Sequence, residues 1–151
     1  ILIVIFVSSL TFARSQQPYR MSEDELKNLL QRIEKSADHF RHSLDSALDK
    51  SALDNTKQED RINDFIKAFE QASDRLKDRF GKKHSAATDV QEVLERAAII
   101  DRFMTRHTLT AKAQEDWMNL RRLLDDLAQW ARRRWRGSPA SGPEAAPSSG
   151  K

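Results

Sequence analysis

The sequence predicts an all-α fold, specifically an antiparallel up-down-up-down four-helix bundle. Three observations predict it. Only four Gly and four Pro occur in 151 residues, and most of them lie in the last fifteen positions, so the middle of the chain lacks helix breakers. Four segments space their apolar residues alternately three and four positions apart, which places them on one face of a helix. A Ser or Thr stands at the start of each segment, where its hydroxyl can cap the helix.

The composition is that of one soluble domain. Hydrophobic residues make up 38% of the chain and charged residues 32%, which is enough to bury a core beneath solvated outer faces. The net charge of +3 arises from 26 basic and 23 acidic residues that are closely interspersed, so the charge indicates no specific nucleic-acid partner. The absence of cysteine excludes disulfides, thiolate metal sites and thiol catalysis.

The first fifteen residues resemble a secretory signal that is truncated at its front. The run from Ile1 to Phe12 is apolar but shorter than the roughly 20 residues that span a bilayer as a helix. Small residues at Ala13 and Ser15 predict cleavage after Ser15, so that the mature chain begins at Gln16. The alternative is that upstream residues extend this run into a permanent anchor.

The first helical segment begins after Ser22. Ser22 and Glu25 have the spacing of a capping box, in which each side chain binds a free amide at the helix start. The apolar stripe that follows predicts a bundle seam. It consists of Leu26, Leu30, Ile33, Ala37, Phe40, Leu44 and Ala47.

The second segment begins with the same device, at Thr56 and Glu59, after the turn-prone pair Asp54 and Asn55. It ends at Gly81. Its predicted core stripe is Ile62, Phe65, Phe69, Ala72, Leu76 and Phe80.

The third segment begins near Thr88, with Gln91 as the reciprocal capping partner, and the fourth begins near Thr110 and ends before Gly137. The third stripe comprises Val90, Val93, Ala97, Ile100 and Met104, widened by Leu94, Ile99 and Phe103. The fourth comprises Ala113, Trp117, Leu120, Leu124, Leu127 and Ala131.

Short connections between these segments favour antiparallel neighbours, which gives the bundle over residues 16–136. An alternative is that two helical hairpins complete their core only by dimerising, so the sequence leaves monomer and homodimer open. Residues 137–151 are mostly Ser, Pro, Ala and Gly, and this composition predicts a disordered tail.

The sequence contains no recognisable catalytic or cofactor site. His39 and His42 lie three residues apart, but Phe40 and Leu44 define the core side of this helix, so both histidines are expected to be exposed. Nearly every Ser and Thr is explained by a cap, a turn or the tail, which leaves no nucleophile with a His and an orienting carboxylate. Asp101 lies among apolar residues, and we expect it to be partly buried and paired with an Arg of a neighbouring helix.

The most unusual local feature lies at the end of the fourth segment, where four arginines are interspersed with two tryptophans. Arginine supplies charge and tryptophan suits a wet boundary, so the cluster is a candidate site for an anionic surface or an acidic partner. The structural alternative is that the basic residues complement the helix dipole and the tryptophans cap the core. The cluster consists of Trp130, Arg132, Arg133, Arg134, Trp135 and Arg136.

Several short stretches resemble secreted all-helical proteins of acidobacterial type, a family without an assigned activity. The resemblance covers most of the chain from Ser22 to Trp135 and implies export and a helical fold. These stretches are Asp38-His39-Phe40-Arg41, Ser43-Leu44-Asp45, Asp60-Arg61-Ile62-Asn63, Ile100-Asp101-Arg102-Phe103-Met104, Ala113-Gln114-Glu115-Asp116-Trp117 and Leu124-Asp125-Asp126-Leu127-Ala128.

The second half is also similar to envelope stress chaperones whose helices carry a Leu-Thr-x-x-Gln motif. Here Leu109 and Thr110 are followed by Gln114, one residue too far, and the motif occurs once instead of twice. This departure weakens the chaperone assignment.

The leading expectation is therefore an exported, non-enzymatic binding or structural module of the cell envelope, periplasmic or extracellular and without a cofactor. Its expected partner is another envelope protein or an anionic surface. A periplasmic holdase-like chaperone is the alternative, and a metal-binding or enzymatic bundle is the third possibility.

Overall fold

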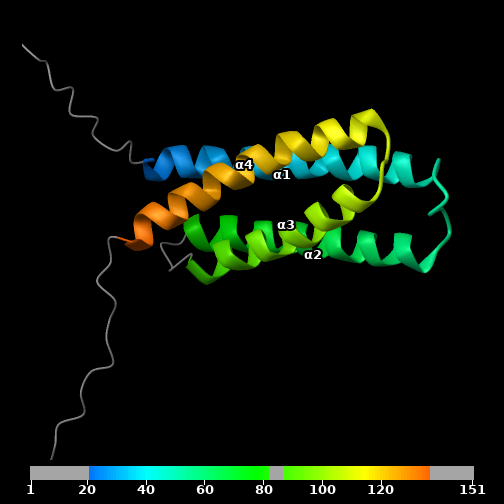
Figure 1. Ribbon diagram of the computed structural model, residues 1–151. Helices are drawn as coiled ribbons and strands as arrows, with labels where there is room; N and C mark the ends of the chain where they lie inside the picture. Colours follow the sequence, from blue (N-terminus) through cyan, green and yellow to red (C-terminus); the bar gives the residue numbers. More distant parts are fainter. Residues whose placement is uncertain (1–20, 82–86, 137–151) are drawn as a thin grey trace, which may run out of the picture.

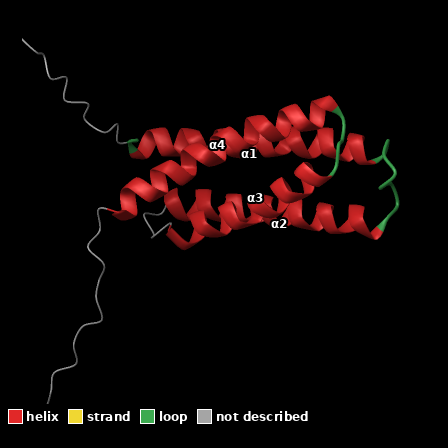
Figure 2. Ribbon diagram, viewed as in Figure 1, coloured by secondary structure: helices red, strands yellow, loops and turns green. Residues whose placement is uncertain are grey.

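The computed structural model describes residues 21–81 and 87–136, and these residues form the predicted four-helix bundle (Figure 1). The helices are α1 (Glu23–Leu48), α2 (Lys57–Gly81), α3 (Ala87–Arg106) and α4 (Ala111–Arg136). Short loops join α1 to α2 and α3 to α4, and no strand occurs in the described ranges (Figure 2). The predicted signal segment, residues 1–15, and the predicted tail, residues 137–151, lie outside these ranges.

The four helices pack in a closed ring. In Figure 1, α1 lies beside α4 and α2 lies beside α3, and contacts of α1 with α2 and of α3 with α4 complete the ring. The chain reverses its direction at each connection, so neighbouring helices are antiparallel, as predicted from the short loops. No described helix is long and apolar enough to cross a membrane.

Local hydrogen bonds explain where three of the helices begin. At Ser22 both halves of the predicted capping box form, because the Glu25 amide donates to the Ser22 hydroxyl and the Ser22 amide donates to the Glu25 carboxylate. The hydroxyls of Thr56 and Thr110 each accept a bond from an amide three residues further on, as N-cap residues do. The predicted cap of α3 is not formed: α3 begins one residue before Thr88, and the Gln91 side chain donates to Glu95 instead.

The apolar stripes of α1, α3 and α4 are buried as predicted, and with α2 they form one continuous core within a single chain. Phe40 and Phe69 are among its largest fully buried side chains. The centroids of the Phe40 and Trp117 rings lie 5.1 Å apart, so a contact between large side chains joins α1 to α4. Each buried large side chain contributes roughly 1.5–3 kcal/mol.

The predicted stripe of α2 is wrong at one position. Phe65 is 38% exposed, and Ile66 occupies the core instead. Phe65 and Ile66 follow Ile62 by three and four residues, so both lie near the same face of the helix. The orientation of α2 in the bundle turns Ile66, and not Phe65, towards the core. Phe80 is only partly buried, against the edge of the core.

Candidate functional site

A pocket of about 330 Å³ opens between α2 and α3, near the ends of these helices that lie beside the α1–α2 loop. We call it the arginine groove. Its lining residues are Gln58, Arg61, Ile62, Phe65, Ile99, Arg102, Phe103, Arg106 and His107.

Helical spacing explains how these side chains meet. On α2, Arg61 and Phe65 are one turn apart, and on α3 the pair Arg102 and Arg106 has the same spacing. Because α2 and α3 are antiparallel, the first turn of α2 faces the last turn of α3. The groove therefore places arginines from two helices along one apolar floor.

Aromatic side chains form much of the apolar lining. The Phe103 ring and the His107 ring lie 4.5 Å apart between centroids at an angle of 35°, which is a tilted stack. Phe65 faces them from α2 and remains partly open to solvent. The pocket is therefore lined by rings from both helices together with three arginines.

A polar contact joins α2 to the end of α3 at one extremity of the groove. The Nε2 atom of Gln58 lies 2.8 Å from Nε2 of His107. An amide nitrogen only donates, so with this orientation of the Gln58 side chain the Nε2 atom of His107 is the acceptor. The contact fixes the imidazole ring that stacks on Phe103.

The three groove arginines differ from the other arginines of α2 and α3 in their electrostatic partners. Within the described residues, Arg61, Arg102 and Arg106 form no ion pair, and all three are exposed. By contrast, the remaining arginines of these helices are paired with carboxylates. These pairs are Arg75 with Glu92 at 2.7 Å, Arg79 with Asp89 at 3.2 Å and Arg96 with Glu92 at 3.0 Å.

The paired arginines are matched to their carboxylates. Hydrogen bonds from Arg75 and Arg96 hold the pKa of Glu92 below its ordinary value, because they favour the ionised form. The groove has no such counter-charge among its lining residues. Arg102 and Arg106, one turn apart on α3, instead repel each other weakly. Of these two arginines, only Arg106 lies in the last turn of α3, where the helix dipole stabilises a positive charge.

The cluster predicted at the end of α4 has a partly structural role. Trp130 is buried, and its ring packs edge-on against the ring of Phe80, with 6.2 Å between the ring centroids. The Arg134 guanidinium lies over the Trp130 ring at 5.6 Å, a cation–π contact. Arg132 and Arg133 are exposed, as is Arg134. The side chains of Trp135 and Arg136 lie outside the described part of the structure, and partner binding by this cluster stays a prediction.

Asp101 is partly buried and paired, as expected from its apolar neighbours. Its Oδ1 atom accepts a hydrogen bond from the Trp117 indole at 3.0 Å and lies 3.2 Å from the guanidinium of Arg121. Both partners belong to α4, so the contact joins α3 to α4. His39 and His42 are exposed on α1, also as expected.

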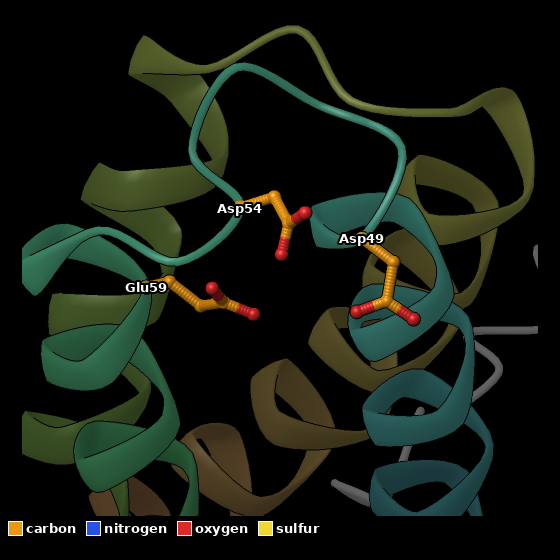
Figure 3. A group of neighbouring side chains, drawn as sticks. All are labelled: Asp49, Asp54 and Glu59. Atoms are coloured by element: carbon orange, nitrogen blue, oxygen red, sulfur yellow. The ribbon is translucent and has the colours of Figure 1, made fainter.

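A group of carboxylates that the sequence did not single out gathers at the α1–α2 loop. Oxygen atoms of Asp49, Asp54 and Glu59 lie within 4.8 Å of one another (Figure 3). The loop itself accounts for two of them, because Glu59 accepts a bond from the Asn55 amide and Asp54 accepts one from the Asn55 side chain. Asn55 has a positive φ of 58°, which Asn tolerates in tight turns. We call this group the acidic cluster and assign it no ligand.

Comparison of the chain with protein-family models, with curated proteins and with solved structures gives no match.

The arginine groove was not predicted from the sequence. Its residues are split between two helices, and only their packing brings the two sets together. The available signal was a spacing of one helical turn, between Arg61 and Phe65 and between the rings of Phe103 and His107. Such pairs are ordinary on a solvated helix face, so they carry little information alone.

Proposed function

We propose that this chain is an exported, non-enzymatic binding module of the cell envelope, and that it holds an acidic segment of another protein in the arginine groove. The observation that carries this proposal is the contrast between the arginines of α2 and α3. Three line an open pocket without an ion pair to any described residue, whereas the other three are paired. Guanidinium groups bind carboxylates through two parallel hydrogen bonds, so acidic side chains suit this surface.

The shape of the groove favours a protein segment over an anionic membrane surface. Residues 58–65 of α2 cover about 10 Å along the helix axis, so the pocket is short as well as concave. A concave site of this length admits individual side chains. Proteins that bind a bilayer through a helix usually present a long apolar face with basic residues on both sides.

The amount of exposed apolar surface is small for a holdase-like chaperone. Among the described residues, the large hydrophobic side chains that are exposed are Phe65, on α2, and Met118, on α4. They do not form one extended apolar patch. A site for unfolded clients would be expected to expose more contiguous apolar area.

The proposal is tested by measuring the affinity of the full chain for a fluorescently labelled oligoglutamate peptide by anisotropy. We expect binding that weakens as salt is added, because exposed charges are screened within about 8 Å at physiological ionic strength. The triple variant R61Q/R102Q/R106Q is expected to weaken binding about tenfold or more, equivalent to about 1.4 kcal/mol.

The matched control is R132Q/R133Q/R134Q, which removes the same charge from the end of α4. It is expected to change the affinity less than about twofold. Equal losses in the two triple variants would show that binding depends on net charge alone and would contradict the groove. A larger loss in the control would instead assign binding to the cluster at the end of α4.

A further inference from the structure

We propose that the bound acidic segment carries an aromatic side chain, which inserts into the arginine groove while flanking carboxylates pair with the arginines. This inference rests on the proposed function and adds to it the chemistry of the recognised segment. Three features of the groove support an aromatic anchor.

The first feature is the exposed ring of Phe65. A Phe at this position does not contribute to the core, because Ile66 fills the corresponding place. The ring instead forms part of the groove wall, next to the arginine one turn before it. Exposed aromatic rings beside basic side chains are enriched at protein interfaces. Phe65 thus offers a contact that an acidic side chain alone would leave unused.

The second feature is the stacked pair on the opposite wall. The rings of Phe103 and His107 stack with 4.5 Å between their centroids, and the Gln58 side chain on α2 contacts the His107 ring. The rings are therefore already ordered before a partner arrives, so little side-chain freedom remains to be lost on binding. An inserted ring can pack between this pair and Phe65 in the tilted or offset arrangements that aromatic groups prefer.

The third feature is the combination of size and charge. The pocket holds about 330 Å³, the lower end of the range for sites that bury a compact ligand. This space suits one large side chain rather than a whole helix face. Guanidinium groups stack on aromatic faces as well as pairing with carboxylates, so Arg61 and Arg102 can contact both parts of such a segment.

The test uses three capped peptides of equal length and the full chain. One has a central Trp flanked by glutamates, one has a central Ala flanked by glutamates, and one has a central Trp flanked by glutamines. We expect the first to bind about tenfold more tightly than the second, and the third to bind more weakly than the first by a similar factor.

A pair of single variants assigns the aromatic contribution to the groove. F65A is expected to remove most of the advantage of the Trp peptide over the Ala peptide, while both acidic peptides still bind. The matched control is M118A. It shortens Met118 on α4, which with Phe65 is exposed among the large hydrophobic side chains of the described residues, and M118A is expected to bind the Trp peptide more tightly than the Ala peptide, as the wild type does. Circular dichroism of both variants verifies the fold, which an exposed position should preserve.

The outcomes separate this inference from the proposed function. If neither acidic peptide binds, the proposed function is wrong and the inference fails with it. If the two acidic peptides bind equally well, the groove remains an anion site but the aromatic anchor is overturned. An unchanged Trp advantage in F65A also overturns it, because the anchor would then lie elsewhere.

Discussion

The indole of Trp117 donates a hydrogen bond of 3.0 Å to the Oδ1 atom of Asp101, which also lies 3.2 Å from the Arg121 guanidinium. Trp117 is almost fully buried, so its N–H group depends on this acceptor. The Asp101→Ala substitution is expected to lower the free energy of unfolding by about 1–3 kcal/mol, since it leaves a buried donor unpaired. Urea denaturation measures this change.

Arg121→Ala serves as the comparison for that substitution. The Arg121 side chain is more than half exposed, so its ion pair with Asp101 is expected to contribute less than about 1 kcal/mol. Asp101→Ala removes both interactions and Arg121→Ala removes only the ion pair, so equal losses in the two variants would show that the ion pair, and not the indole hydrogen bond, is the important interaction.

Two phenylalanines of α2 are expected to respond differently to truncation. Phe69 is fully buried and Phe65 is partly exposed. Phe69→Ala should cost about 3–5 kcal/mol, because it opens a cavity in the core, whereas Phe65→Ala should cost less than about 1 kcal/mol. Thermal and urea unfolding of the two variants give both values. Similar losses would mean that Phe65 belongs to the core after all.

Glu70 is expected to make stability depend on pH. Burial raises the pKa of Glu70, although Arg41, 2.8 Å away, acts in the opposite direction. Its second oxygen is buried without a hydrogen-bond partner in the described structure. Since the pKa is higher in the folded than in the unfolded state, the folded protein binds this proton more readily, and stability declines as pH rises through the raised value.

The substitution Glu70→Gln isolates this effect, because Gln is uncharged at every pH. The free energy of unfolding of the wild type, minus that of Glu70→Gln, should fall as pH rises from about 4 to neutrality. Parallel urea titrations at several pH values measure this difference. A difference that grows with pH would indicate that the Arg41 ion pair outweighs the burial of the carboxylate.

Removing a groove arginine is expected to leave the fold as stable or slightly more stable. Arg102 and Arg106 are like charges one turn apart, and such pairs destabilise helices by about 0.2–0.5 kcal/mol. Arg102→Gln should therefore raise the free energy of unfolding by up to this amount. Arg75→Gln is the control, because it breaks an ion pair with Glu92 and should lower stability by up to about 1 kcal/mol. Scanning calorimetry compares the two variants.

The helices and most of the core could be predicted from the sequence because spacing alone determines which side of a helix is apolar. Ser22 with Glu25 identified a true capping box, and Asp101 was correctly expected to be partly buried beside an Arg. Phe65 was the error, since a spacing of three and a spacing of four both return to nearly the same face. Only the orientation of α2 against its neighbours decides between them.

The groove could not be predicted for a different reason. Its cations lie some forty residues apart in the sequence, on Arg61 and on Arg102 with Arg106, and they meet only because α2 packs against α3. The sequence emphasised the dense Trp and Arg cluster at the end of α4, where Trp130 proves to be buried against Phe80. Local density of charge is visible in a sequence, whereas the absence of a counter-charge depends on the fold.

The position of the acidic cluster gives the arginine groove a direction. Asp49, Asp54 and Glu59 gather at the α1–α2 loop (Figure 3). Gln58, in the first turn of α2, and His107, just after α3, lie at the same end of the bundle. A negatively charged segment is repelled from that end and attracted towards the arginines, over about one screening length of 8 Å. A segment whose acidic residues are concentrated on one side of its anchor would therefore bind in a single orientation, with its less acidic side towards the loop.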